Sequence, residues 1–156
     1  MVDSDRLNKW LTLGANLGVL VGIILLIVEL DQNRDMMRAQ TRHDLAMGIV
    51  DLLQTPANNE QLADVIYRAN AGDEITPKEA FQFEIRTNAL FRYWEDVHYQ
   101  YREGLYDDIE FARQREAWKN SFANSRRQGA YWCRVRLLYS PEFMNEMDGL
   151  LGDNPC

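Results

Sequence analysis

The sequence predicts an all-α protein, with one N-terminal transmembrane helix that continues into a compact bundle of about five to six helices. Three observations favour this class. Residues 11–28 form one uncharged apolar run that is long enough to cross a bilayer. Beyond it, apolar residues recur at helical spacing between proline and glycine boundary signals. No segment alternates with period two between turn signals, so we expect no sheet.

The composition limits the possible partners. The 156 residues carry 24 acidic and 17 basic side chains, a net charge of −7. Nucleic-acid binding needs a clustered basic surface, so we expect no nucleic-acid partner. The length suits one domain, which we divide into a short polar tail (1–10), a transmembrane helix (11–30) and a helical domain with a long juxtamembrane helix (31–156).

The apolar run reads LTLGANLGVLVGIILLIV, from Leu11 to Val28. As a helix it measures about 27 Å, close to the thickness of a hydrocarbon core. Trp10 stands at the position of an interfacial aromatic residue. A buried core helix and a cleaved signal peptide are the alternatives, but the run exceeds a usual signal core and ELDQNRD follows it in place of small residues. We interpret it as a retained single-pass anchor.

Three glycines line one face of this span. Gly14, Gly18 and Gly22 are spaced four residues apart, and Asn16 lies beside them. Small residues in register allow two membrane helices to approach closely, and an asparagine can hydrogen-bond across their interface. The alternative is that glycine is simply frequent in membrane helices. We expect the lipid bilayer and other transmembrane helices, of the same chain or of a membrane complex, as partners.

The orientation of the span is nearly balanced by charge. Arg6, Lys9 and the terminal amine precede it, and three arginines follow it: Arg34, Arg38 and Arg42. These three could contact lipid headgroups together with Trp10, or form a solvated face with neighbouring aspartates. A short tail is easily translocated and unpaired thiols favour a reducing compartment, so we expect the domain in the cytoplasm.

Capping residues, prolines and glycines then predict where each of the remaining helices begins and ends. The first helix should extend to about residue 54 and face the core through Leu45, Ile49 and either Leu52 or Leu53. A capping box at Thr76–Glu79, with proline at the first helical position, should open the longest bundle helix. The expected helices after the first span residues 58–71, 77–103, 108–123, 126–139 and 141–151.

Aromatic residues concentrate on the central helices. Phe91, Trp94, His98 and Tyr101 share one face of the 77–103 helix, and Phe81 and Ile85 should extend its apolar surface. Their expected packing partners on the next two helices are Trp118, Phe122, Trp132, Val135 and Tyr139. Core packing is the simpler interpretation, and a ligand pocket among Phe91, Trp94, Tyr101 and Trp132 is the alternative.

Few residues suggest catalysis. Glu95 and His98 form one E-x-x-H pair, but a di-iron site needs a second pair, so they are weak metal candidates and we expect no metal, cofactor or catalytic residue. Cys133 and Cys156 are too few for a disulfide scaffold, and we interpret Cys133 as a structural thiol. Arginines lie among the acids and aromatics of the central helices, where ion pairs explain them more simply than an anion site: Arg86, Arg92, Arg102, Arg134 and Arg136.

The run FRYWEDVHYQYREGLYDDIEF, followed by LLYSPEFMNEMDGLL, resembles a group of functionally uncharacterised bacterial membrane proteins. The resemblance includes the Y-x-Y-R-x-G-L-x-D block from Tyr99 to Asp107, and Glu29 with Gln32-Asn33 after the span. It implies membrane anchoring by a single span and an all-helical domain, and it carries no activity. We expect the protein in a bacterial inner membrane.

The function expected from these features is that of a membrane-anchored, non-catalytic interaction protein. It would be a homo-oligomer or an accessory or assembly subunit of a larger membrane complex, packing through the glycine stripe. The alternative is a metal-dependent or ligand-binding helical bundle that uses Glu95, His98 and the aromatic region.

Overall fold

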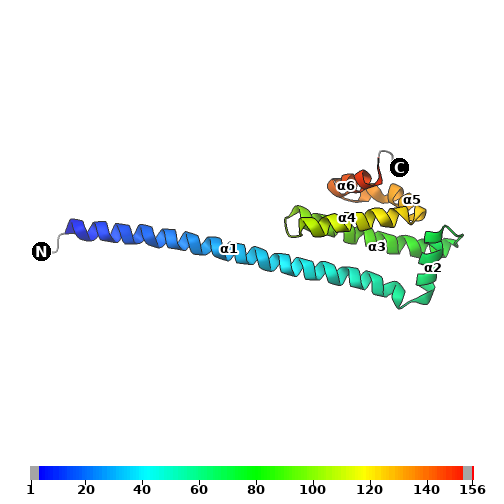
Figure 1. Ribbon diagram of the computed structural model, residues 1–156, viewed down its shortest axis with the longest axis horizontal. Coiled ribbons are helices and arrows are strands. Elements are labelled where there is room, and N and C mark those ends of the chain that lie inside the picture. Colours follow the sequence, from blue (N-terminus) through cyan, green and yellow to red (C-terminus); the bar gives the residue numbers. More distant parts are fainter. Residues whose placement is uncertain (1–3, 153–155) are drawn as a thin grey trace. The chain divides into compact units, whose positions relative to one another are not determined.

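The helical prediction is confirmed in a computed structural model of the chain, which describes residues 4–152 and Cys156. These residues form six α-helices and one 3₁₀ turn, and no strand occurs among them (Figure 1). The elements are α1 (Ser4–Ala57), α2 (Glu60–Ala71), α3 (Pro77–Arg102), α4 (Asp108–Ala123), α5 (Arg126–Val135), the 3₁₀ turn η1 (Arg136–Leu138) and α6 (Pro141–Leu151).

The chain divides into two units, Met1–Ala39 and Gln40–Cys156. The described part of the first unit is helical throughout and its side chains are exposed. The second unit contains the rest of α1 together with α2 to α6. Within it α2 packs on α3, α3 on α4, and α4 on both α5 and α6.

The signals read from the sequence begin and end these helices as expected. The Thr76 hydroxyl accepts from the Glu79 backbone N–H at 3.3 Å, and Glu79 Oε2 accepts from the Thr76 N–H at 2.7 Å, which completes the capping box of α3. Asp107 caps α4 by accepting from the Ile109 N–H at 2.8 Å. After α2 the chain turns at Gly72, whose φ of +89° is strained for other residues.

The end of α5 differs from the prediction. A helix was expected to run to Tyr139, but α5 stops at Val135 and tightens into η1. Pro141 disfavours a helical conformation at Ser140, which is extended with ψ of 142°. Tyr139 is already extended, and its hydroxyl lies 2.6 Å from Asn88 Oδ1 on α3. The chain is thus extended at both Tyr139 and Ser140, and the last turn before them closes as 3₁₀.

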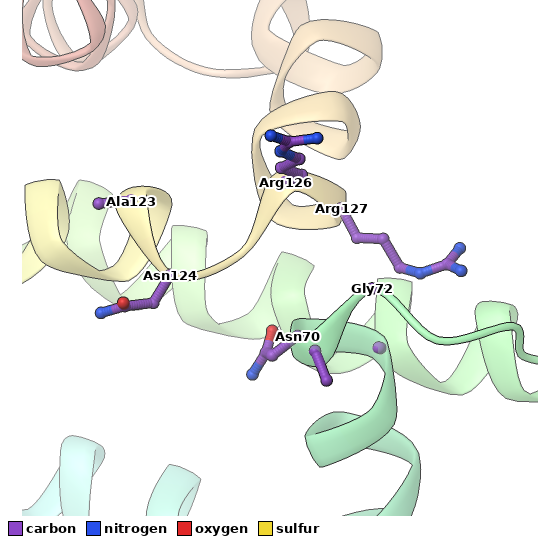
Figure 2. A pocket seen from close by; sticks show the side chains of 8 residues that line it. Asn70, Gly72, Ala123, Asn124, Arg126 and Arg127 are labelled. Carbon is purple, nitrogen blue, oxygen red and sulfur yellow. The ribbon is translucent and has the colours of Figure 1, made fainter.

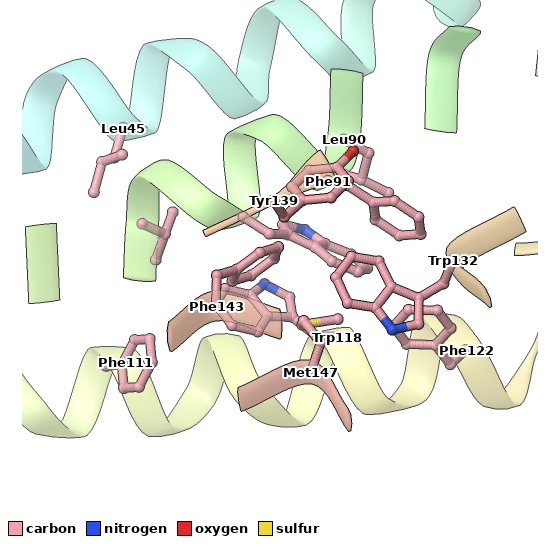
Figure 3. Close-up of a cluster of buried hydrophobic side chains, with 12 residues drawn as sticks. Leu45, Leu90, Phe91, Phe111, Trp118, Phe122, Trp132, Tyr139, Phe143 and Met147 are labelled. Atoms are coloured by element: carbon pink, nitrogen blue, oxygen red, sulfur yellow. The ribbon is translucent and has the colours of Figure 1, made fainter. Parts of the chain in front are cut away.

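Aromatic rings fill the core of the second unit (Figure 3). Phe91 is fully buried and its ring centre lies 5.3 Å from that of Trp132 and 5.7 Å from that of Phe122. Trp118 stacks on Trp94 at 5.5 Å. The expected aromatic face of α3 is confirmed.

The prediction that Phe81 and Ile85 extend this core is wrong. They are 63% and 55% exposed, one and two turns into α3 on a face that no other helix covers. The opposite face, with Phe83, packs against α2 in a second small core. The apolar surface of α3 is thus buried on one side in its first turns and over more of its circumference farther along.

The last turns of α1 join the core of the second unit. Leu45 is buried, and Ile49 and Leu52 pack against the aromatic cluster, whereas Leu53 is 55% exposed. The Tyr93 hydroxyl donates to the Leu45 carbonyl at 3.1 Å, which fixes α3 to this part of α1. The choice between Leu52 and Leu53 left open by the sequence is therefore decided for Leu52.

Candidate functional site

The N-terminal part of α1 is the one described helix that is long and apolar enough to cross a membrane. An 18-residue window within it has a mean hydropathy of 2.5, and none of that window is buried by the rest of the chain. The core helix of a soluble protein and a signal sequence pass the same test of length and hydropathy. The Thr12 hydroxyl donates to the Asn8 carbonyl at 2.8 Å, so this polar group is satisfied inside the helix.

The glycine stripe lies open on this segment. A Cβ atom built on Gly14, Gly18 or Gly22 meets no described atom within 4 Å, and Asn16 is exposed beside them. A flat strip of backbone is therefore available to a second helix. The stripe as an interface remains a prediction.

The arginines after the span do not act as one uniform stripe. Arg42 Nη2 lies 2.7 Å from Glu110 Oε1 on α4, although its side chain is 73% exposed. Arg34 is exposed, and Arg38 has an interaction of its own. Contact of Trp10, Arg34, Arg38 and Arg42 with lipid headgroups remains a prediction, and Arg42 would keep its partner while making it.

The E-x-x-H pair serves packing. Glu95 accepts from the Arg92 guanidinium and from the Ser140 backbone N–H, both at 2.7 Å. Burial alone would raise the pKa of Glu95, but these hydrogen bonds lower it. His98 is buried against the rings of Phe111 and Phe143, and burial lowers its pKa. Among the described residues no group of three His, Cys, Asp or Glu side chains could hold a metal ion.

Four of the five central arginines form the expected ion pairs. Three pairs join different elements: Arg102 with Glu142, Arg134 with Glu84, and Arg136 with Asp148. Arg92 pairs with Glu95 on its own helix and also donates to the Leu138 carbonyl. Arg86 differs, because its Nε is buried and no described atom accepts from it. This difference could not be predicted, since all five arginines have acids or amides nearby in the sequence.

Three residues of the suggested pocket, Phe91, Tyr101 and Trp132, pack closely against other aromatic rings. Phe91 and Trp132 are fully buried against other rings, and Tyr101 stacks on Phe111 with ring centres 3.8 Å apart. The Trp132 indole N–H donates to Asp148 Oδ1 at 3.1 Å. Trp94 is the member of this set that lines a cavity, which is described below.

A polar pocket of about 550 Å³ lies where α2 ends and α5 begins (Figure 2). Arg126 and Arg127 both line it, but Figure 2 shows their guanidinium groups directed to different places. Arg127 donates to the Asp73 carbonyl at 2.8 Å. The two charges therefore do not converge on one point, and the pocket lacks the geometry of an anion site.

The prediction of unpaired cysteines is wrong. Cys133 on α5 and Cys156 form a disulfide with their Cα atoms 5.4 Å apart, within the usual range. The bond ties the segment after α6 to α5. Sequence reasoning missed it because two cysteines 23 residues apart give no sign of whether the fold brings them together.

Comparison of the chain with protein-family models, curated proteins and solved structures finds no match.

Proposed function

We propose that the protein is a membrane-anchored, non-catalytic interaction protein, which acts as a homo-oligomer or as an accessory or assembly subunit of a larger membrane complex. The observation that carries this proposal is the uncovered apolar segment of α1 with Gly14, Gly18 and Gly22 open along one face. Lipid can cover such a segment, but lipid gives no reason for three glycines in register, each of which weakens a helix.

The proposed location is a bacterial inner membrane, with a single retained span. A cleaved signal sequence would pass the same hydropathy test, but the helix that contains the apolar run continues without a break to Ala57. The buried Leu45 near its end then belongs to the core of the second unit. Cleavage after the apolar run would have to occur within a continuous helix, which supports retention.

The disulfide changes the prediction of which side of the membrane the helical domain occupies. The expectation of a cytoplasmic domain rested partly on free thiols, and the described cysteines are paired. Disulfides persist in oxidising compartments and are rare in the cytoplasm. The charges on either side of the span decide little. We therefore propose that the helical domain lies on the periplasmic side.

Gly18→Leu tests the interaction role. If a second helix packs on the stripe, a leucine at its centre forces the two backbones apart and removes dispersion contacts that lipid does not replace. Leucine suits lipid, so insertion and abundance should be unchanged while assembly is lost. Crosslinking in detergent and native gels should show a smaller species.

Leu17→Ala is the matched control, because it changes side-chain volume on another face of the same helix. We expect its assembly to equal that of the wild type. If both variants assemble as the wild type does, the glycines face lipid and the interaction proposal loses its main support.

A further inference from the structure

Residues from five helices of the second unit line a partly enclosed cavity of about 360 Å³ beside the aromatic core. Its wall is largely apolar, and includes Ile49, Ile66, Phe83, Leu90, Trp94 and Trp118. Cavities of about 300–1,000 Å³ with apolar walls and a few polar groups are typical of small-molecule sites. This one lies on the α2 side of Trp94, away from the packed rings around Phe91.

Three hydrogen-bond donors on the lining residues have no acceptor among the described atoms. They are Arg86 Nε, Trp118 Nε1 and Gln128 Nε2. Trp118 is fully buried and Gln128 is 5% exposed, so solvent does not readily reach them. The Ser121 hydroxyl donates to Gln128 Oε1 at 3.1 Å, which leaves the amide N–H₂ as the unused end of that side chain. Buried donors are normally satisfied, so these lining residues carry hydrogen-bonding capacity that the described protein atoms do not use.

The charges around the cavity also favour an anionic ligand. No described lining residue is Asp or Glu, and Arg86 is the one lining residue with a charge. Burial lowers the pKa of Arg86, as expected of a guanidinium without a counter-ion. The Gln82 carbonyl, one turn earlier on α3, is also buried without a donor. The side-chain amide of Gln82 is neutral, so a hydrogen bond from Arg86 to its oxygen would leave the positive charge of Arg86 uncompensated.

We propose that this cavity binds a small apolar monocarboxylate, whose carboxylate pairs with the guanidinium of Arg86 and whose hydrocarbon part lies against the apolar wall. One lining cation matches one negative charge, whereas a phosphate dianion would remain half compensated in an apolar space. A planar guanidinium pairs with a carboxylate through two parallel hydrogen bonds. This binding role is independent of the glycine stripe.

The full chain in a neutral maltoside detergent can be titrated with two acids, hexanoate and phenylacetate, and with the corresponding alcohols, hexanol and 2-phenylethanol. Trp94 and Trp118 line the cavity, so tryptophan fluorescence reports binding, and calorimetry and thermal unfolding measure it independently. We expect each bound acid to raise the unfolding midpoint and each alcohol to bind at least tenfold more weakly. Preference for hexanoate would indicate a lipid-derived ligand, and preference for phenylacetate an aromatic acid from solution.

Arg86→Met should reduce acid binding at least tenfold while the free variant unfolds at or above the wild-type midpoint, because an unpaired buried charge is removed. Arg102→Met is the control, since Arg102 lies on the same helix outside the cavity. Three results would overturn the proposal: neither acid binds, the alcohols bind as tightly as the acids, or Arg86→Met binds the acids as the wild type does. If Arg86→Met does not fold, Arg86→Lys, which keeps the charge but loses the planar fork, should show weakened binding of the same acids.

Discussion

His98 lies 6.0 Å from the ring centre of Phe111 and 5.8 Å from that of Phe143, and it is 7% exposed. Burial lowers its pKa, Arg102 acts in the same direction, and the nearby carboxylates oppose this: Glu146, Glu142 and Glu95. The imidazole is therefore a neutral part of the core at pH 7. At this scale the surroundings of a residue decide its role, and a motif such as E-x-x-H does not.

His98 should make the domain less stable as the pH falls from 7 to 5.5. The unfolded chain takes up a proton at the ordinary histidine pKa, near 6.5, while the folded chain resists it, so protonation favours unfolding. Urea unfolding in detergent at the two pH values measures the loss. His98→Leu should flatten this dependence, and His43→Gln, at an exposed position, should retain it. An equal slope in wild type and His98→Leu would contradict the assignment.

Each bundle helix after α1 begins at a residue that signals its start. The side chains of Asn59, Thr76, Asp107 and Ser125 accept from backbone N–H groups in the first turns of α2 to α5. Glu79 does more than complete a capping box, because it also pairs with Arg68 on α2. The backbone N–H of Thr76 and the guanidinium of Arg68 hold the pKa of Glu79 at about 2. One carboxylate thus fixes both the start of α3 and its contact with α2.

Glu79→Gln should reduce the acid sensitivity of the domain. The wild-type contribution of Glu79 is complete above its ordinary pKa of 4.5 and is lost as the pH falls toward 2, since the unfolded chain binds the proton first. Stability measured between pH 5 and 2.5 should therefore fall less steeply in the variant. Glu60→Gln, in the exposed first turn of α2, should follow the wild-type curve. If Glu79→Gln also follows it, the carboxylate does not contribute as described.

Local signals account for what the sequence predicted well, and long-range contacts for what it did not. Thr76, Pro77 and Glu79 lie within four residues and place the start of α3 without reference to the rest of the chain. Arg86 and Arg134 look alike in sequence, yet Arg134 pairs with Glu84 on a different helix, whereas Arg86 Nε has no acceptor among the described atoms. The cavity near Arg86 is equally invisible, since it depends on how five helices leave space between them.

At the scale of the whole molecule, the disulfide links compartment to stability. Cys133 and Cys156 are 23 residues apart, and closing a loop of that size in the unfolded chain contributes about 3 kcal/mol. A domain on the periplasmic side would retain the bond, whereas the cytoplasm would keep both thiols reduced. Location and stability can thus be tested together.

Cells quenched in acid and treated with a maleimide-linked polymer should show no modified protein until a reductant is added, after which two thiols should react. Cys156→Ser should expose one reactive thiol and lower the free energy of unfolding by about 3 kcal/mol. Glu74→Cys, in the segment between α2 and α3, should be labelled by an impermeant thiol reagent added to intact cells. Two reactive thiols without reductant, and no labelling at position 74, would place the domain in the cytoplasm.

The packing of helices on their neighbours in sequence has a consequence for the time course of folding. α2 packs on α3, α3 on α4 and α4 on α5, so most contacts close only short loops. Chains with such local contacts fold in microseconds to milliseconds, while disulfides form over seconds to hours. The helices therefore pack well before Cys133 and Cys156 are oxidised. The covalent bond secures a structure that has already formed, and the chain needs no oxidant to reach that structure.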